Sequence, residues 1–503
     1  MEKKLKPSAL FTDGAVLCRG KEIRLFGEAA EGVCVSAALT DAAGKLLARG
    51  ESIARDGKFL ISLPPQAAQE GCRITFAAGA ETSEAGDIAI GDVYLAGGQS
   101  NMELELQYAL EGPETLPDLK DPLLRFFNVP KQAYDDGNEP QFDRTRWHMA
   151  DPENGKYNSA VATLFARKMR EKHPDIPLGI IGCYWGGTSV TCWMDEDTLR
   201  ETGEGVRYTE RYNRECGEKT IEQFLREEKE WRRTMDAWDK TVADFKDGHP
   251  GCTWPEITAA CGPCPWFPPK GPGSPFRPHG LVHMMFDKVC PVSLTGVLYY
   301  QGEEDAGQTD RYDELMAAMI RLWRKKLRAP ELPFLFVQLP MWLDFEAEDT
   351  FQWAKTRLSQ AAVRDAVRNT GMICLLDEGE YGNIHPVKKR PVGERLAELA
   401  LAMAGENGKV SPQALDMYAD GDTLAVRLTQ PVKTSDGEAP RLLEIAGGDG
   451  KFVPAEGEIS GSTLRLKAEG IKHPVKARYA WTDWSDKVNL FGGNGLPLEP
   501  FSL

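Results

Sequence analysis

The stretch of sequence that decides the fold is Gly91-Asp92-Val93-Tyr94-Leu95-Ala96-Gly97-Gly98-Gln99-Ser100-Asn101-Met102-Glu103. Its apolar run ends at two glycines and then gives way to spaced apolar residues, which predicts a buried strand, a tight turn and a helix. Ser100 falls in the turn, where the preceding glycines permit backbone angles that would expose its hydroxyl beside unpaired N–H groups. Ser100 is therefore either a nucleophile or a simple helix cap, and the choice depends on partners elsewhere in the chain.

The alternation of strand-like and helical runs continues beyond this stretch. Strand-like runs at 178–182, 296–300, 334–338 and 372–376 alternate with helical runs near 160–172, 312–327 and 356–367. This pattern predicts an α/β fold in which a parallel sheet is covered by helices on both faces. In such folds the functional site lies outside the carboxyl ends of the strands, and Ser100 follows one of these ends.

Short alternating runs flank this region on both sides. Residues 7–89 and the segment from 411 onward consist of brief strand-like runs separated by turn residues, which is typical of small β modules. We therefore expect three parts: an N-terminal β-sandwich module at 1–90, an α/β domain at 91–405 and a C-terminal β-rich module at 406–503.

A long insertion interrupts the α/β domain at about 205–285. An aromatic residue recurs every seven positions within a charged run, at Phe224, Trp231, Trp238 and Phe245. This spacing predicts a long amphipathic helix whose aromatic stripe packs on a neighbour. The proline-rich stretch from Pro255 to Pro278 is predicted to be irregular, and a loop of this size is typical of a lid or a binding wall.

Cys261 and Cys264, within this insertion, have the spacing of a thioredoxin dithiol. That motif needs its first thiol at a helix N-terminus after a strand. Here prolines follow at once and no βαβ unit surrounds the pair, so the sequence disfavours a redox role. No second ligand pair stands at a spacing suited to zinc, so we expect no metal site.

The composition excludes several classes of partner. A net charge of -16 argues against nucleic acid and against an anionic membrane surface, because both require clustered Lys and Arg. No stretch reaches the roughly 18 apolar residues of a membrane span, and the basic N-terminus lacks the apolar run of a secretory signal. We expect a cytoplasmic protein with free thiols, since its eleven cysteines are odd in number. An oligomer is left open.

The base that Ser100 would need can be sought among only seven histidines. His385 follows the end of a predicted core strand by a loop and precedes a helix, so we expect it at the same edge of the sheet as Ser100. It is either a general base or a surface histidine that caps a helix. The glycine-rich stretch 185–189 and the polar stretch 300–305 also follow strand ends, and four polar strand ends on one sheet favour a catalytic site.

Together these four stretches resemble the sialate O-acetylesterase family, a branch of the SGNH-type serine hydrolases related to acetylxylan esterases. The resemblance rests on residues 98–103 with Ser100, 186–188 with the nearby Trp193, 300–303, 384–386 with His385, and 392–397. It extends to residues 10–17 and 489–501, so it covers nearly the whole chain. It implies an SGNH-hydrolase-like three-layer α/β/α core with a parallel sheet, flanked by the two β modules.

The resemblance further implies a serine esterase that removes O-acetyl groups from carbohydrate. Ser100 would attack the ester while His385 takes its proton, and water would then hydrolyse the acetyl-enzyme. The expected oxyanion and substrate-side groups are the backbone N–H groups of Ser100 and Gly187 and the side chains of Gln301, Glu303, Asn101 and Trp193. No metal or organic cofactor is expected, because ester cleavage at an activated serine requires none.

One position departs from the family pattern. Many SGNH hydrolases carry Asp three residues before the histidine, where this chain has Gly382. Asp377, at the predicted strand end, is the first candidate for the acid that orients His385, and Glu303 is the second. A backbone carbonyl acting in a Ser–His dyad is the remaining option.

O-acetylated sialic acid is the substrate that the family name suggests, and acetylated xylan or another oligosaccharide is the alternative. Trp185, Trp193 and Trp266 are aromatic candidates for stacking on either sugar. Two other classes remain as hypotheses: a non-catalytic sugar-binding protein, and more remotely a thiol oxidoreductase built on Cys261 and Cys264. A fluorophosphonate label distinguishes them, because only an activated serine reacts with it.

Overall fold

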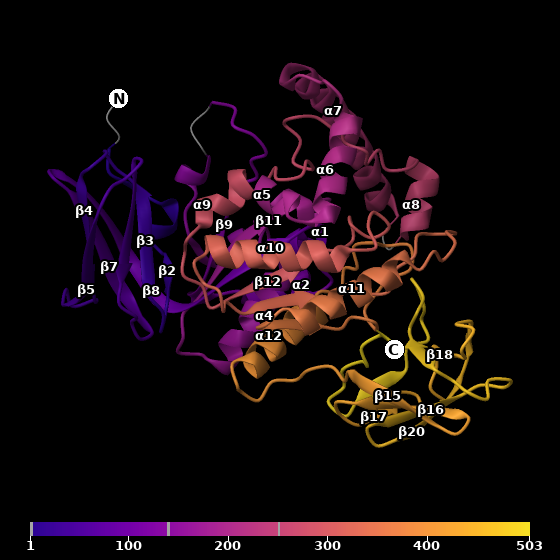
Figure 1. Ribbon diagram of the computed structural model, residues 1–503. Coiled ribbons are helices and arrows are strands. Elements are labelled where there is room, and N and C mark those ends of the chain that lie inside the picture. The colour runs from indigo at the N-terminus through magenta and orange to yellow at the C-terminus, as the bar shows by residue number, and fades with distance from the viewer. Residues whose placement is uncertain (1–3, 138–140, 250–251) are drawn as a thin grey trace.

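The computed structural model describes residues 4–137, 141–249 and 252–503, so residues 1–3 of the basic N-terminus lie outside it. A central sheet and its helices lie between two β modules, the N-terminal one in indigo and the C-terminal one in yellow (Figure 1). This is the mixed α/β fold with flanking β modules that the sequence predicts. No helix in the described ranges combines the length and the apolar character that crossing a bilayer requires.

The functional edge of the molecule is set by an 11-stranded sheet whose main path runs β10-β9-β11-β8-β12-β13-β14. The strands of this path are β8 Glu81–Gly98, β9 Asp121–Asn128, β10 His148–Ala150, β11 Leu178–Tyr184, β12 Gly296–Tyr300, β13 Phe334–Val337 and β14 Thr370–Ile373. β10 is antiparallel to β9, and the other neighbours along the path pair in parallel. The carboxyl ends of β8, β11, β12 and β14 therefore meet at one edge.

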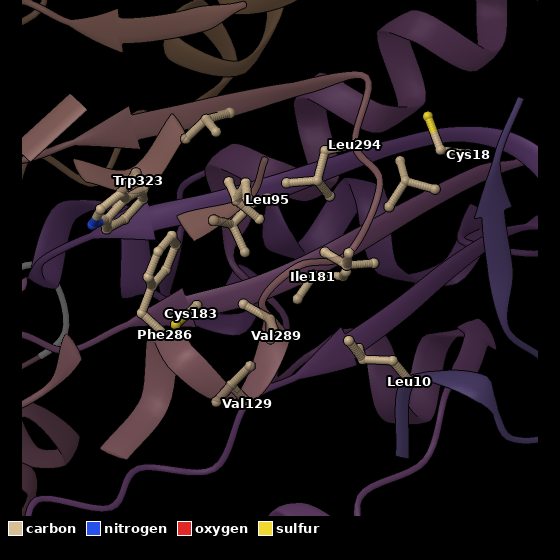
Figure 2. Close-up of a cluster of buried hydrophobic side chains, with 14 of the residues drawn as sticks. Leu10, Cys18, Leu95, Val129, Ile181, Cys183, Phe286, Val289, Leu294 and Trp323 are labelled. Carbon is tan, nitrogen blue, oxygen red and sulfur yellow. The ribbon is translucent and has the colours of Figure 1, made fainter. Parts of the chain in front are cut away.

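Alternate side chains of these strands enter two hydrophobic clusters, one on each face of the sheet, because successive side chains of a strand point to opposite faces. Leu95 of β8 lies in one cluster with Trp323, and its neighbour Tyr94 lies in the other with Phe165. In the first cluster the rings of Phe286 and Trp323 stack at 4.2 Å between centroids (Figure 2). Burial of both faces explains why the strands are almost continuously apolar.

The helices that cover the two faces follow from the same pattern. α4 (Ala160–Lys172) and α12 (Arg390–Met403) cover the face with Tyr94, and α10 (Tyr312–Lys326) covers the face with Leu95. α11 (Gln352–Ala366) packs beside α10. Shorter helices connect these elements: α1 Ser100–Glu103, α2 Gly112–Thr115, α3 Pro152–Gly155, α5 Glu196–Arg200 and α9 Asp287–Val289.

The insertion contains the predicted long helix, α7 (Ile221–Gly248), which projects from the core in Figure 1. A capping box at Thr220 begins it. On its aromatic stripe Phe224 is buried, Trp231 donates its indole N–H to the carbonyl of Pro265 at 2.8 Å, and Trp238 donates to Gly262 at 3.2 Å. The stripe thus packs within the protein, and its partner is the proline-rich segment, which the sequence did not specify.

The proline-rich segment is less irregular than predicted. Residues Trp254–Cys261 form helix α8, and α6 (Gly203–Cys216) precedes α7. Pro255 is compatible with α8 because it occupies the first turn, where its missing N–H would have no helical partner. Cys261 ends this helix instead of beginning it, and burial raises the pKa of the Cys264 thiol. Both observations argue against an activated dithiol.

Two β modules flank the core. The N-terminal strands are β1 Lys6–Pro7, β2 Val16–Cys18, β3 Ile23–Glu28, β4 Cys34–Thr40, β5 Leu46–Ile53, β6 Lys58–Leu63 and β7 Gln69–Ala78. The C-terminal strands are β15 Ala414–Asp420, β16 Thr423–Leu428, β17 Val432–Thr434, β18 Leu443–Ala446, β19 Phe452–Pro454, β20 Glu456–Ser460, β21 Thr463–Lys467, β22 Lys476–Tyr479, β23 Leu490–Gly492 and β24 Phe501–Ser502. β7 and β2 pair with β8, so the N-terminal module shares a sheet with the core.

Candidate active site

Ser100 and His385 meet at the carboxyl edge of the sheet. Ser100 begins α1 directly after β8, and its Oγ lies 2.8 Å from Nε2 of His385, which comes from the loop between β14 and α12. The turn before Ser100 requires glycine: Gly98 has a φ of +131°, and a Cβ there would lie 2.1 Å from the carbonyl oxygen of Tyr300. The sequence therefore identified both members of this pair correctly as neighbours.

The surroundings of His385 favour a neutral imidazole, although part of the residue is open to solvent. Its backbone N–H donates to Oδ1 of Asn383 at 3.0 Å, which fixes the loop around it. Burial, assisted by the positive charge of Lys389, lowers the pKa of His385 to about 4. A neutral imidazole can accept the proton of a serine hydroxyl, so the pair has the protonation state that general-base chemistry needs near neutral pH.

Neither carboxylate expected to orient His385 contacts it among the described residues. Asp377 instead binds Arg395 of α12 with both oxygens, at 2.7 and 2.6 Å. Arg395 also donates to the carbonyl of Cys374 at 2.7 Å, so this pair ties α12 to the segment after β14. The expectation for Asp377 is corrected accordingly: its partner is an arginine one helix away, which the spacing in the sequence did not reveal.

Glu303 and Asn101, expected on the substrate side, form a buried network beneath the pair. The amide of Asn101 donates to Oε1 of Glu303 at 2.6 Å and to the carbonyl of Ile384 at 2.9 Å, and its oxygen accepts from Nζ of Lys389 at 2.6 Å. Burial raises the pKa of Glu303 and lowers that of Lys389 to about 8. Asn101 therefore ties the turn of Ser100 to the loop of His385, and Lys389 is a participant that the sequence did not point to.

The loop after β11 brings Gly186 against Ser100, and Gly187 follows it in the chain. A Cβ on Gly186 would lie 3.2 Å from Cβ of Ser100, and the N–H of Gly186 donates to Oε2 of Glu103 at 2.6 Å. Gly187 has a φ of +71°. Within the described ranges, the N–H groups of Ser100 and Gly187 donate to no other residue. Unpaired N–H groups near a nucleophilic serine are what a developing oxyanion requires.

Comparison with known proteins agrees with this site. A family model described as "Carbohydrate esterase, sialic acid-specific acetylesterase" matches residues 281–401. Sialate O-acetylesterases are similar over most of their length: that of Rattus norvegicus is 25% identical over 83% of this chain and 78% of its own, and that of Homo sapiens is 24% identical over 82% and 75%. The crystal structure of a carbohydrate acetylesterase from Xanthomonas citri superposes with a TM-score of 0.75 at 27% identity, covering 99% of each chain.

The chain is similar to sialate O-acetylesterases over most of its length, and the comparisons support membership of that family. It is accordingly a carboxylic ester hydrolase. The family model contains His385 but not Ser100, whereas the similarity to the Xanthomonas citri acetylesterase spans both.

Gln301 of this esterase does not face the serine. Its amide donates to Oδ2 of Asp305 at 2.6 Å, to Oε1 of Gln99 at 3.1 Å and to the carbonyl of Thr188 at 3.2 Å, and its oxygen accepts from Tyr312 at 2.6 Å. The side chain is fully buried. The expected role of Gln301 as an oxyanion donor is therefore corrected, because both ends of its amide are occupied inside the protein.

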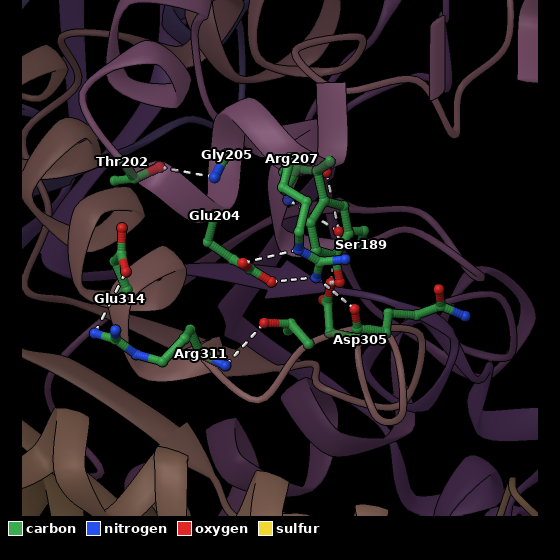
Figure 3. A network of polar contacts seen from close by, with 12 residues as sticks. Ser189, Thr202, Glu204, Gly205, Arg207, Asp305, Arg311 and Glu314 are labelled. Carbon is green, nitrogen blue, oxygen red and sulfur yellow. Dashed lines mark hydrogen bonds and ion pairs between the residues drawn. The ribbon is translucent and has the colours of Figure 1, made fainter. Parts of the chain in front are cut away.

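Asp305 is the hub of this interior network and was not singled out by the sequence (Figure 3). Besides Gln301, it accepts from the hydroxyl of Ser189 at 2.7 Å, the N–H of Val190 at 2.9 Å and the hydroxyl of Tyr208 at 2.7 Å. These hydrogen bonds oppose the effect of burial, which raises its pKa. Asp305 thereby fixes the glycine-rich loop of this esterase to the end of β12.

Trp193, the remaining predicted substrate residue, is part of the core. It is fully buried, donates its indole N–H to Thr188 at 3.0 Å and packs edge-on against Trp323. Trp185 is partly buried, and Nζ of Lys131 lies over its ring, 5.5 Å from the ring centroid. Among the residues that the structure describes, no three His, Cys, Asp or Glu side chains come together in a way that would hold a metal ion.

Proposed function

We propose that this esterase removes O-acetyl groups from carbohydrate by a serine mechanism, with O-acetylated sialic acid as the first candidate substrate. The observation that carries the proposal is the 2.8 Å contact between Oγ of Ser100 and Nε2 of a neutral His385. The N–H groups of Ser100 and Gly187 support it, because they are unpaired among the described residues and an acyl-transfer serine needs unpaired donors for its oxyanion.

In the proposed reaction Oγ of Ser100 attacks the acetyl carbonyl carbon while Nε2 of His385 takes the hydroxyl proton. The N–H groups of Ser100 and Gly187 stabilise the oxyanion. The C–O bond to the sugar then breaks, and the imidazolium returns its proton to the leaving sugar oxygen. A water molecule, deprotonated by His385, attacks the acetyl-serine in the same way and releases acetate and free Ser100.

We assign the orientation of His385 to its loop and not to a carboxylate. The bond from His385 N–H to Asn383 and the bond from Asn101 to the carbonyl of Ile384 hold the loop on both sides of the imidazole. Asp377 is occupied by Arg395. The catalytic unit is thus a Ser–His dyad, the option that remains when neither candidate acid reaches the histidine.

The core is proposed to be an SGNH-type three-layer α/β/α domain. Helices on both faces of a largely parallel sheet, and a serine at the end of its strand, support this assignment. We retain the division into an N-terminal module at 1–90, a catalytic domain at 91–405 with the insertion, and a C-terminal module at 406–503. Strand β8 crosses the first of these boundaries.

The choice of sugar rests on what the relatives are named. The mammalian relatives are sialate O-acetylesterases, and the Xanthomonas citri structure is a carbohydrate acetylesterase without a stated sugar. An acetylxylan or other oligosaccharide esterase is therefore the second candidate.

Both candidate substrates can be tested by measuring acetate release, from 9-O-acetylated sialic acid and from acetylated xylo-oligosaccharides. Ser100→Ala and His385→Ala should each abolish release, while the exposed controls Ser462→Ala and His473→Ala should retain it. A folded wild-type protein that releases acetate from neither sugar would instead favour the sugar-binding hypothesis.

A further inference from the structure

The proline-rich part of the insertion reaches the site through Trp266. A Cβ on Gly187 would lie 2.2 Å from Cζ2 and 2.9 Å from Cη2 of Trp266, so the indole rests directly on the backbone of the glycine-rich loop. The preceding residue, Gly186, is the one whose Cβ would approach Ser100 to 3.2 Å. Ser100, the two glycines and Trp266 therefore follow one another in continuous contact.

Trp266 is held in one orientation by aromatic neighbours. Trp231 of α7 meets it edge-on, with 6.3 Å between ring centroids and 68° between planes, and Phe276 does the same at 5.8 Å and 80°. Trp231 also anchors the chain next to Trp266 by donating to the carbonyl of Pro265 at 2.8 Å. Edge-on aromatic pairs of this kind stabilise a defined geometry, so the indole does not need a ligand to order it.

In spite of this bracing, 39% of Trp266 remains exposed. A tryptophan that served only to pack the insertion would gain more by full burial, because indole is among the largest apolar surfaces a protein can bury. The Trp266 indole is exposed and rigid, and it contacts Gly187, the neighbour of the glycine that approaches Ser100. Such a surface is suited to a ligand that offers both C–H and hydroxyl groups.

We propose that Trp266 is a specificity-determining residue that forms the wall on which the sugar ring of the substrate packs while its acetyl ester faces Ser100. The inference rests on the proposed esterase function and adds the recognition of the alcohol part of the ester. The acetyl group is small and lies between Ser100 and Gly187, whereas the ring extends beyond it toward the insertion. The class of substrate is therefore an acetylated sugar ring, and a small acyclic acetate ester does not use this wall.

The test compares kcat/KM for the better acetylated sugar with kcat/KM for ethyl acetate, which has no ring. Trp266→Ala should lower kcat/KM for the sugar about 10-fold or more and leave that for ethyl acetate unchanged, and Trp266→Phe should restore most of the loss. Trp254→Ala is the matched control: Trp254 has the same exposed fraction of 39%, lies in the same insertion and packs edge-on against Trp238 at 6.1 Å. It should leave both substrates unaffected.

The outcomes separate this inference from the function on which it rests. If wild type hydrolyses both substrates and Trp266→Ala lowers both equally, or neither, the sugar wall is refuted while the esterase stands. If wild type hydrolyses neither substrate, the proposed function fails and the wall fails with it. Activity of Trp266→Ala on ethyl acetate also reports that the variant is folded around an intact dyad.

Discussion

The hydroxyl of Tyr208 donates to Oδ1 of Asp305 at 2.7 Å and so joins the insertion to the end of β12. Tyr208 lies on α6, and Asp305 also holds the hydroxyl of Ser189 and the N–H of Val190 in the glycine-rich loop. One buried carboxylate thus connects the insertion, the central sheet and the loop that carries Gly187. The position of the Asp305 carboxylate should therefore affect both the free energy of unfolding and kcat.

Tyr208→Phe should reveal this connection. Loss of a buried hydrogen bond to a charged group should lower the free energy of unfolding by about 2 kcal/mol, and kcat should fall because the loop of Gly187 is less well fixed. Denaturant unfolding and acetate release measure the two effects. Tyr212→Phe, one turn later on α6, removes a hydroxyl that donates to Gly271 at 3.0 Å inside the insertion. It should lower stability without lowering kcat; equal losses of kcat in both variants would contradict the role of Asp305.

Gly187→Ala should abolish most activity. A methyl group at Gly187 would clash with the indole of Trp266. In addition, the φ of +71° at this position disfavours any residue with a side chain. Gly217→Ala separates the two effects, because Gly217 has a φ of +63° but nothing within 4 Å of its would-be Cβ. We expect a loss of kcat of about 100-fold or more for Gly187→Ala and an unchanged kcat for Gly217→Ala. Because alanine keeps the backbone N–H, an active Gly187→Ala would show instead that the loop accepts a methyl group here, and that its glycine conformation is not required for turnover.

Asp377→Asn should affect stability and not catalysis. The substitution removes the charge that binds Arg395, a largely buried pair, and should lower the free energy of unfolding by about 2 kcal/mol. The exposed partner of Arg364, Asp365, offers a control, since Asp365→Asn should change stability little. A large fall in kcat for Asp377→Asn at unchanged stability would restore Asp377 as the orienting acid.

The pH dependence should report the neutral His385. Burial disfavours the imidazolium, so its pKa of about 4 keeps the base unprotonated above that pH, and kcat/KM should rise through about pH 4 and stay level above it. Removing the positive charge in Lys389→Met should move this midpoint upward. Lys388→Met, at an exposed lysine paired with Glu378, should not move it. A midpoint near 6.5 in wild type would contradict the lowered pKa of His385.

The same residue makes stability depend on pH. Because the pKa of His385 is about 4 in the folded protein and about 6.5 in an unfolded chain, the unfolded state binds more protons between these values. Stability should therefore decrease as the pH falls from about 6.5 toward 4. His385→Ala should show a shallower decrease over this window, and an identical slope in wild type and variant would argue against the shift.

The sequence predicted Ser100, His385 and the glycine-rich loop because each follows a buried strand, and the ends of parallel strands share one edge. It did not predict which way polar side chains at that edge point. Gln301, Asn101 and Trp193 all turn inward. Their partners include Gln99, Glu303 and Trp323 respectively, which are distant in sequence. Asp377 was misassigned for the same reason, since Arg395 lies 18 residues away on a helix.

The insertion was predicted in outline for a different reason. A seven-residue aromatic spacing is a local property of α7, so the sequence contained both the helix and its stripe. Pro255 favours irregular structure when only the sequence is considered, although proline at the first turn is compatible with a helix such as α8. The contact of Trp266 with Gly187 depends on how a loop folds back over a sheet, and no local pattern encodes it.

Strand β8 passes without a break from one set of partners to another: β7 and β2 pair with its first half, and β11 and β12 pair with its second half up to Gly98. The N-terminal module and the nucleophile are therefore parts of one continuous backbone element. Recombination between relatives at residue 90 would cut β8 in the middle. It would join a first half that is in register with β2 and β7 to a second half, from another protein, that is in register with β11 and β12. The N-terminal module and Ser100 would therefore have to be inherited together.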